Sequence, residues 1–185
     1  MSPVGGDLFG GDLFGDVPSQ PLRLFYALWP TPEIARELNT VARGLQGRVM
    51  NEQGLHVTVG FAGAQLPERI PALCGLALRC PIPRVTLCVD HLQYWSQQFV
   101  VAVPRAVPPE LREAVMRIHA EMRGLGMTVE PRSWSPHITL LRNAPQQVLP
   151  DIAPMAWDID ALHLAVSDGT GAYERRPEWT WPASR

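Results

Sequence analysis

The sequence predicts an α+β fold in which two similar lobes, related by a pseudo-two-fold axis, face one central groove. The first observation is an order of strand, helix and strand that occurs twice along the chain. The second is a four-residue motif, His-X-Thr-X, which falls in the last strand of each unit, at residues 56–59 and 137–140. Hydrophobic residues make up 46% of the 185 residues, enough for the core of one domain. We therefore expect residues 21–185 to form a single bilobal domain.

The first unit begins with an apolar strand over residues 22–28. Thr31 can cap the helix that follows, Pro32 suits its first position, and apolar residues then recur at helical spacing. The first motif strand should run from about residue 55 to 61, and a shorter apolar helix should follow near residues 70–77.

The second unit begins with an expected antiparallel hairpin. Strands near residues 84–89 and 97–103 flank a turn-rich span at 91–95, which we interpret as a long connection. A helix over 109–124 follows, with an apolar stripe and two glycines at its end. After the second motif strand we expect two more strands joined by a glycine turn, at residues 157–167 and 172–179.

The two motifs carry the chemistry of the sequence. Successive side chains of a strand point to opposite faces, so His56 shares a face with Thr58, and His137 shares one with Thr139. Each motif thus places a ring that titrates near neutral pH beside a hydroxyl. A single strand histidine is more often packed or solvated, but two copies with threonine at the same offset favour a shared site. With Arg142 nearby, this set suits phosphoryl transfer.

The other histidines are weaker candidates. His119 lies at the edge of the apolar stripe of its helix, so we expect a boundary position rather than a catalytic one. His163 lies opposite the apolar residues of its strand, where it can line the groove or meet solvent, and we expect the latter.

The first twenty residues contain a tandem repeat, Gly-Asp-Leu-Phe-Gly, at residues 6–10 and 11–15. A glycine-rich acidic segment of this kind cannot build a core, so we predict a disordered tail over residues 1–20. Two interpretations stay open: a solvated extension, or a docking peptide whose Leu-Phe pairs enter the groove of a partner protein.

Composition excludes several classes of protein. A net charge of −2 argues against a grip on long nucleic acid through phosphate neutralisation, while a small phosphate ligand remains compatible with it. All sixteen basic residues are arginine, which excludes Schiff-base, P-loop and lysyl-adenylate chemistry. The sequence has no apolar run of membrane-spanning length and no secretory signal. We therefore expect a cytoplasmic protein that does not enter membranes.

Cysteine spacing indicates neither a disulfide framework nor a zinc site. Cys74, Cys80 and Cys88 are odd in number and lack a C-x-x-C pair. His91 follows Cys88 at a ligand-like spacing, but no second pair completes a metal site, so we interpret Cys88 as a packing residue.

Several segments together resemble a known family. They are Arg-Leu-Phe-Tyr-Ala-Leu at 23–28, the first motif, and the second motif with Pro136 before it and Arg142 after it. These segments resemble the bacterial RNA 2′,3′-cyclic phosphodiesterases, also called LigT-like 2′-5′ RNA ligases, of the two-histidine phosphoesterase superfamily. The resemblance spans most of the chain after residue 21, although Gly54 and Gly60 depart from the common pattern. It implies two lobes of antiparallel sheet backed by helices, one motif on each lobe, and neither a metal nor another cofactor.

The resemblance also implies an activity, the hydrolysis of a 2′,3′-cyclic phosphate at an RNA 3′ end or on a nucleotide to the 2′-phosphate. By this analogy His56 is the acid and His137 the base, a distinction that the sequence itself does not make. Thr58 and Thr139 would then bind phosphoryl oxygens, and Arg142 would oppose the developing charge. The reverse reaction would be 2′-5′ ligation without ATP.

Aromatic residues near the groove can stack on a base, and the candidates are Phe25 and Trp134. For Trp134 a packing role is an equal alternative. Other substrates stay open, such as a cyclic phosphate of ADP-ribose or a 2′-5′ oligonucleotide. So does a protein of another class, a module that binds a nucleotide or RNA end without catalysis. We expect a monomer.

Overall fold

The computed structural model describes residues 20–129, 133–169 and 172–184. The tandem repeats and their predicted docking role lie outside these residues. The described helices are α1 Pro32–Arg43, α2 Ile70–Arg79 and α3 Pro109–Gly124, with 3₁₀ turns η1 Glu52–Gly54 and η2 Pro67–Arg69. The described strands are β1 Leu22–Leu28, β2 Arg48–Val49, β3 Val57–Gln65, β4 Thr86–Val89, β5 His91–Trp95, β6 Phe99–Val103, β7 Ile138–Arg142, β8 Met155–Asp158, β9 Ala161–Ser167 and β10 Tyr173–Pro182.

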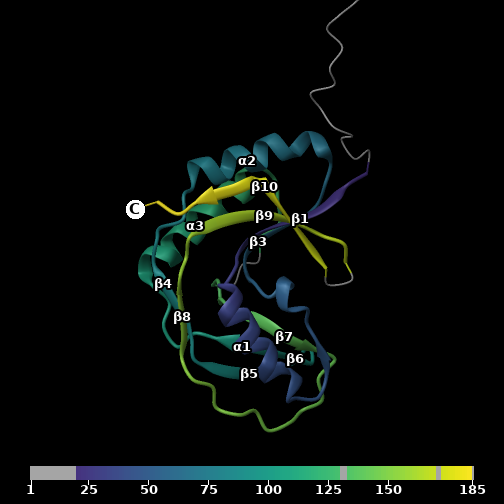
Figure 1. Ribbon diagram of the computed structural model, residues 1–185. Coiled ribbons are helices and arrows are strands. Elements are labelled where there is room, and N and C mark those ends of the chain that lie inside the picture. The colour runs from purple at the N-terminus through teal and green to yellow at the C-terminus, as the bar shows by residue number, and fades with distance from the viewer. Residues whose placement is uncertain (1–19, 130–132, 170–171, 185) are drawn as a thin grey trace, which may run out of the picture.

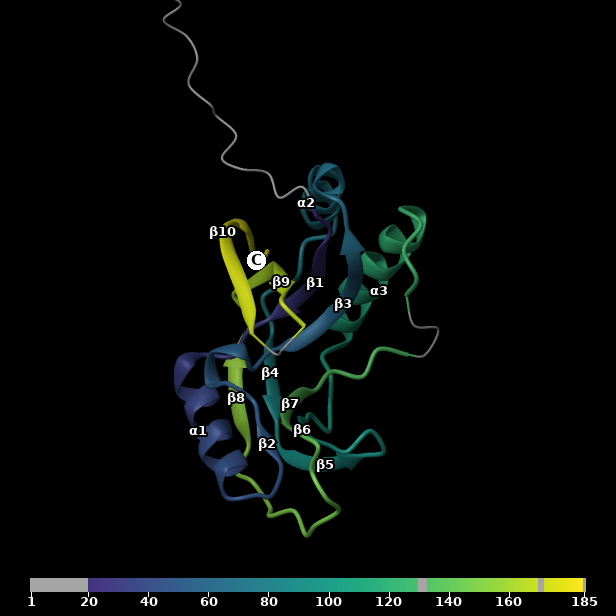
Figure 2. The same cartoon turned by 90° about the vertical axis from the view of Figure 1, so that its right-hand side faces the viewer.

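Eight of the strands form one antiparallel sheet, in the order β10-β9-β1-β3-β7-β6-β5, with β2 beside β7. The strands that carry the motifs, β3 and β7, are neighbours in the middle of this order. They meet at a single residue pair, Val57 with Ile138, and these residues directly follow the two motif histidines. The sheet is therefore narrow between its two halves, β10-β9-β1-β3 on one side and β7-β6-β5 with β2 on the other (Figure 2). This arrangement confirms the predicted two-lobed α+β fold.

The two halves of the chain exchange helices. Helix α1 follows β1 in sequence but packs against β2, β7 and β8, whereas α3 follows β6 and packs against β3 (Figure 1). Helix α2 lies beside α3 and contacts β10. Each lobe is therefore covered by a helix from the other half of the chain, so neither half can complete a lobe by itself.

The apolar residues of the motifs lie in the core as the alternation predicts. Val57, Val59, Ile138 and Leu140 are each at most 1% exposed. Burial of one such side chain stabilises the fold by roughly 1.5–3 kcal/mol. Because the period of a strand is two, the same alternation turns the motif threonines to the opposite face, where the lobes meet.

Helix α1 also begins as the sequence predicts. The Thr31 hydroxyl accepts a hydrogen bond from the backbone N–H of Ile34 at 3.4 Å, and Pro32 is the first helical residue. From the buried side of the helix, the Asn39 amide donates to the carbonyl oxygen of Met50 at 3.0 Å. This bond fixes the segment that leads into the first motif.

The expected hairpin of the second unit is wrong. Residues 91–95 form strand β5, which pairs with β6, while β4 pairs with β8 in a separate two-stranded sheet. The turn lies later, where Gln98 adopts a φ of 62° and its N–H donates to the carbonyl oxygen of Trp95. The strand expected at 157–167 is likewise divided between β8 and β9, which belong to different sheets. Sequence analysis missed β5 because its polar and aromatic residues do not show the pattern of a strand. Its pairing with β6, rather than its composition, keeps it extended.

Candidate active site

A cavity of about 260 Å³ opens where the two lobes meet. His56 and Thr58 line it from one lobe, and His137, Thr139 and Arg142 line it from the other. The structure thus brings together the five polar residues that the sequence selected, and it adds Phe25 to the same cavity.

Each histidine lies immediately before its strand, β3 or β7, and backbone carbonyls hold both in the same way. The Nδ1 atom of His56 is 2.6 Å from the carbonyl oxygen of Gly54, and that of His137 is 2.9 Å from the carbonyl oxygen of Ser135. A carbonyl oxygen only accepts, so each Nδ1 carries the proton of the bond. In the neutral ring this leaves Nε2 as the unprotonated nitrogen on each histidine.

Burial keeps both rings neutral at pH 7. It lowers the pKa of His56 to about 4, against a smaller opposing effect of the bond to Gly54, and the charges of His137 and Arg142 lower it further. Burial also lowers the pKa of His137, and the bond to Ser135 opposes this shift. A bound anion would raise both pKa values, because it stabilises the charged imidazolium.

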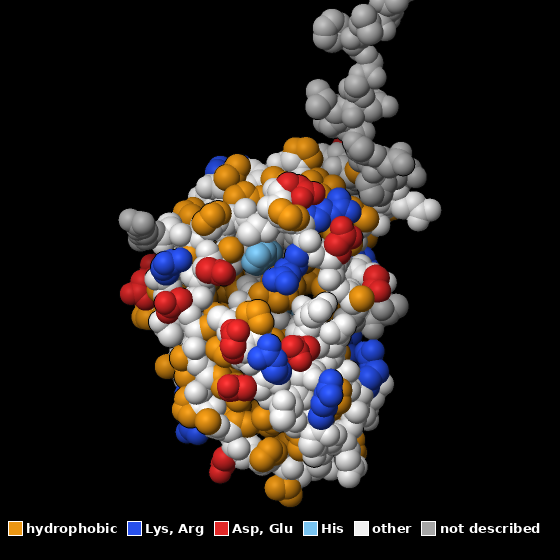
Figure 3. Space-filling model, in the orientation of Figure 1, with side chains coloured by type: hydrophobic (Ala, Val, Ile, Leu, Met, Phe, Trp, Pro, Cys, Tyr) orange, Lys and Arg blue, Asp and Glu red, His pale blue; other side chains and the backbone are white. Residues whose placement is uncertain are grey.

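The cavity is cationic although the protein is acidic. Arg142 and Arg23 line it, and no aspartate or glutamate does so among the described residues. On the face of the molecule shown in Figure 3, by contrast, arginine and acidic side chains are interspersed. Positive charge is therefore concentrated where the motifs meet, which favours an anionic ligand there.

Arg142 has an unused donor inside this cavity. Its Nη2 atom donates to the Tyr173 hydroxyl at 3.5 Å, and its guanidinium lies over the ring of Phe99, 5.5 Å from the centroid. Its Nε atom is buried and has no hydrogen-bond partner among the described residues. A buried N–H of a charged group needs an acceptor, and a phosphoryl oxygen in the cavity would supply one.

Aromatic rings surround His56. The ring centroids of Phe25, Trp29 and Tyr173 lie 4.9, 5.1 and 4.7 Å from that of His56. Sequence analysis missed Trp29 and Tyr173. Tyr173 belongs to β10 and reaches His56 through the pairing of β10 with β9 and of β9 with β1, which no local pattern reveals.

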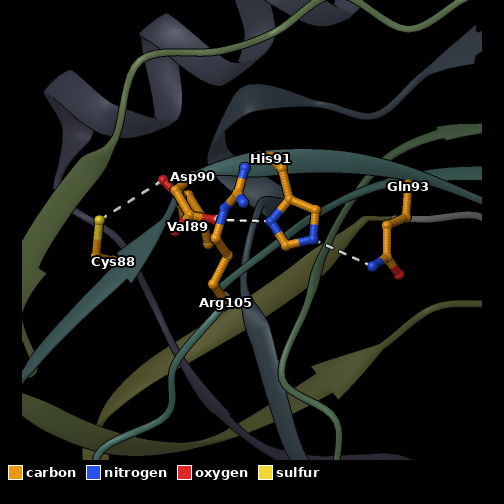
Figure 4. A network of polar contacts seen from close by, with 6 residues as sticks. All are labelled: Cys88, Val89, Asp90, His91, Gln93 and Arg105. Carbon is orange, nitrogen blue, oxygen red and sulfur yellow. Dashed lines mark hydrogen bonds and ion pairs between the residues drawn. The ribbon is translucent and has the colours of Figure 1, made fainter.

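His137 packs against a single aromatic residue, Trp95, with ring centroids 4.3 Å apart. The indole N–H of Trp95 donates to Gln93 Oε1 at 3.1 Å. The Gln93 amide nitrogen lies 3.1 Å from His91 Nε2, and His91 Nδ1 lies 2.6 Å from Asp90 Oδ1 (Figure 4). Since an amide nitrogen only donates, His91 accepts at Nε2 and donates from Nδ1 to the carboxylate. This chain of bonds, which we call the β5 network, supports Trp95 from outside the cavity.

Trp134, the second predicted stacking residue, lies outside the cavity. Its indole N–H donates to the backbone carbonyl oxygen of Thr58 at 2.9 Å, so it ties the segment before His137 to the other motif strand. It lines a separate hollow of about 290 Å³, together with Arg105 and Arg112.

The remaining histidines do not reach the cavity. His119 donates from Nε2 to the carbonyl oxygen of Val59 at 2.6 Å and lies on α3, as expected for a boundary residue. His163, expected to meet solvent, does so only in part: it is half-buried, with Nδ1 3.0 Å from the Thr180 hydroxyl and its ring edge-on to Trp29.

The described part of the chain contains no group of three or more His, Cys, Asp or Glu side chains placed to hold a metal ion. Its three cysteines are unpaired. None of its helices combines the length and the apolar character needed to cross a membrane.

Comparison with known proteins decides the family. No family model matches the chain. The RNA 2′,3′-cyclic phosphodiesterase of Escherichia coli (strain K12) is 32% identical over 135 residues, which are 70% of this chain and 77% of that protein. The chain belongs to this family, within the two-histidine phosphoesterases. It is accordingly an enzyme, and the resemblance carried by the two motifs is confirmed.

Solved structures agree with this membership. The crystal structure of E. coli LigT in apo form has a TM-score of 0.78 and 27% identity, covering 90% of this chain and all of LigT. LigT complexed with 3′-AMP gives a TM-score of 0.79 with the same coverage. A protein of Thermus thermophilus shares the fold, with a TM-score of 0.69 and 21% identity over 87% of this chain and 97% of its own.

Proposed function

We propose that this phosphoesterase hydrolyses the 2′,3′-cyclic phosphate of an RNA 3′ end or a nucleotide to the 2′-phosphate. The observation that carries the proposal is the pair of histidines, one from each lobe, that line one cationic cavity with Nδ1 tied to the backbone and Nε2 left for chemistry. The printed names of the E. coli relatives support the substrate: one is an RNA 2′,3′-cyclic phosphodiesterase, and LigT was crystallised with 3′-AMP.

In the proposed reaction, water attacks phosphorus in line with the departing 3′-oxygen. His137 accepts the proton of the water at Nε2 while the new P–O bond forms. His56 donates a proton from Nε2 to the 3′-oxygen as the old P–O bond breaks. The assignment of acid and base follows the family resemblance.

The substrate itself helps to load the acid. The pKa of His56 is about 4 in the empty cavity, so this ring is neutral at pH 7 before the substrate binds. The phosphodiester anion raises this pKa by opposite-charge attraction and thereby favours the protonated form. The hydroxyls of Thr58 and Thr139 donate to the non-bridging oxygens, and the unused Nε of Arg142 opposes the charge that grows in the transition state.

The same groups serve a second ring opening, in which a 5′-hydroxyl takes the place of water and opens the cyclic phosphate to form a 2′-5′ linkage. In that case His137 takes the proton of the 5′-hydroxyl, and His56 again protonates the 3′-oxygen. Hydrolysis dominates in water because its nucleophile is far more abundant.

The decisive experiment incubates the purified protein with 2′,3′-cyclic AMP, with and without EDTA, and identifies the product. We expect 2′-AMP in both cases. His56→Ala and His137→Ala should each lower the rate at least about 100-fold, the usual contribution of a general acid or base. His119→Gln is the matched control, because His119 lies outside the cavity, and it should keep wild-type turnover.

Three results would contradict the proposal. Formation of 3′-AMP would mean that the 2′-oxygen and not the 3′-oxygen leaves. Wild-type turnover in His56→Ala or His137→Ala would mean that the two histidines are not the acid and the base. Tight binding without turnover would favour a nucleotide or RNA-end binding module. A panel that adds an ADP-ribose cyclic phosphate and a 2′-5′ oligonucleotide separates the remaining substrates, since a preference for either would displace the RNA end.

A further inference from the structure

The mouth of the cavity carries a second cation next to an exposed aromatic ring. Arg23 of β1 and Phe61 of β3 both line the cavity, and the Arg23 guanidinium lies over the Phe61 ring, 5.4 Å from its centroid. Phe61 is 46% exposed, and it is the one aromatic residue among the strongly exposed large apolar side chains of the described chain. A single exposed ring is common on protein surfaces, but this ring lies in the cavity wall beside a cation, where it can contact a ligand.

The charge of Arg23 is also unused by the protein. Among the described residues the side chain of Arg23 is exposed and has no hydrogen bond or ion pair, and its one recorded contact is with the Phe61 ring. Arg142, deeper in the same cavity, instead bonds to Tyr173. The cavity therefore offers two separate cationic points, and the proposed reaction at a single phosphorus uses only the inner one.

Strand geometry sets the spacing between these two points. Thr58 and Phe61 lie on the same strand, three residues apart, and both line the cavity. The register between β1 and β3 shifts between Tyr26 and Ala27, and this irregularity brings Phe61 to the same face as Thr58. The separation is therefore somewhat shorter than the roughly 10 Å of a regular strand. It is a distance that one further nucleotide can span from a phosphate bound beside Thr58.

We propose that Arg23 and Phe61 form a subsite for the nucleotide on the 5′ side of the terminal one, with its base stacked on Phe61 and the connecting phosphate bound by Arg23. This inference rests on the proposed function and narrows its substrate to an RNA end of at least two nucleotides. Stacking on an aromatic ring beside an arginine is how proteins hold single-stranded RNA without reading its sequence. The acidic net charge agrees, because only the last nucleotides need to be held.

The test compares three substrates: 2′,3′-cyclic AMP, the same nucleotide with a 5′-phosphate, and the dinucleotide ApA with a 2′,3′-cyclic phosphate. For the wild type we expect kcat/KM for the dinucleotide to exceed that for cyclic AMP by about tenfold, the effect of one stacked base. Arg23→Gln and Phe61→Ala should each remove most of this gain, so that the ratio of kcat/KM for the dinucleotide to kcat/KM for cyclic AMP falls to near one. Phe61→Trp should retain the gain, because it keeps a ring.

Arg176→Gln is the matched control. Arg176 also stacks on an aromatic ring, 4.6 Å from the centroid of Trp179, but it does not line the cavity. The salt dependence of kcat/KM gives a second measurement, which Arg23→Gln would not change if Arg23 had only a structural role. For the dinucleotide, Arg23→Gln should reduce the slope of log kcat/KM against log salt by about 0.7, the share of one phosphate contact on a single strand. Arg176→Gln should leave both the gain and the slope unchanged.

The outcomes separate this inference from the function beneath it. If no substrate is hydrolysed, the proposed function fails. If cyclic AMP and the dinucleotide are hydrolysed equally well and neither variant changes their ratio, the function stands and the subsite is refuted. If the 5′-phosphate alone gives the full gain and Phe61→Ala has no effect, Arg23 binds a mononucleotide phosphate and the assignment to RNA is overturned.

Discussion

The two cavity histidines occupy equivalent places in the two halves of the sheet, yet the aromatic side chains packed behind them differ. We call these two groups of side chains the two walls. Three aromatic rings surround His56, and the Trp29 indole among them is only 8% exposed and donates to the backbone carbonyl oxygen of Gln53. His137 has one aromatic neighbour, Trp95, which is partly exposed and donates to the side chain of Gln93.

This difference shows that the motif fixes the position of each ring while its neighbours fix the proton affinity. Each motif provides the same bond from Nδ1 to a carbonyl oxygen two residues earlier. Burial by residues outside the motif then lowers the pKa of His56 to about 4. A duplicated sequence pattern has thus produced two rings of the same geometry in unlike surroundings.

The largest expected effect tests whether the two walls act as one unit. His56→Ala and His137→Ala should each cost at least about 100-fold in kcat for 2′,3′-cyclic AMP. The double variant should cost little more than either single one, because an acid without its base is of little use. Steady-state kinetics of the four proteins measures this coupling. Costs that multiply in the double variant would mean that the histidines act independently.

The next effect is on stability. An unfolded histidine titrates near 6.5, while folding lowers the pKa of His56 to about 4, so between these values the unfolded state binds more protons. Stability is therefore complete above pH 6.5 and is lost as the pH falls through 4. We expect His56 to contribute roughly 2 kcal/mol to this loss, after allowance for its partial exposure to the cavity. Urea unfolding at pH 7 and pH 4.5 should show a smaller difference for His56→Gln than for the wild type, and an unchanged difference would contradict the burial effect.

The pH profile of kcat/KM sharpens the comparison further. Both pKa values lie below the ordinary 6.5, so the bell-shaped profile should have its maximum below pH 6.5. The rate follows the fraction of enzyme with His56 protonated and His137 neutral, and in such a product the lower pKa sets the acid limb, which we assign to His56 with its pKa of about 4. Tyr173→Ala lets water reach His56 and should move the acid limb up by about one unit. Trp95→Ala, on the other wall, should leave the acid limb in place. A limb that moves equally in both variants would show that the walls do not control the rings separately.

Local rules of strand and helix predicted the parts of the fold and site that lie within short segments. The alternation in the motifs predicted which residues enter the core, and Thr31 with Pro32 predicted the start of α1. The pairing of His56 with His137 was accessible because the motif occurs twice. The first two inferences needed only residues close together in the sequence, and the third needed only the recurrence of a short motif.

The parts that sequence analysis missed depend on contacts between distant segments. Tyr173 reaches His56 through two strand pairings, and Phe61 lies at the cavity mouth because β1 pairs with β3. Trp95 was placed in a turn because β5 has a polar composition, and only its pairing with β6 makes it a strand. Trp134 was expected at the cavity because it precedes the second motif, but its indole bonds to the backbone of Thr58.

The smallest expected effect comes from the two tryptophans, whose N–H groups have unlike partners. Trp29→Phe removes the donor to the carbonyl oxygen of Gln53, a partly buried bond, and should lower the free energy of unfolding by about 1 kcal/mol, measured in urea. Trp95→Phe keeps the ring against His137 but frees Gln93, which then no longer fixes that ring through the β5 network. We expect kcat to fall about threefold, with little change in KM or stability, an effect typical of a positioning contact.

Gln93→Ala should give the same fall in kcat, and Trp95→Phe combined with Gln93→Ala should add nothing further, because both changes break one chain of bonds. Additive losses, or a loss of stability equal to that of Trp29→Phe, would show that Trp95 serves only packing and that the two walls differ in composition but not in role.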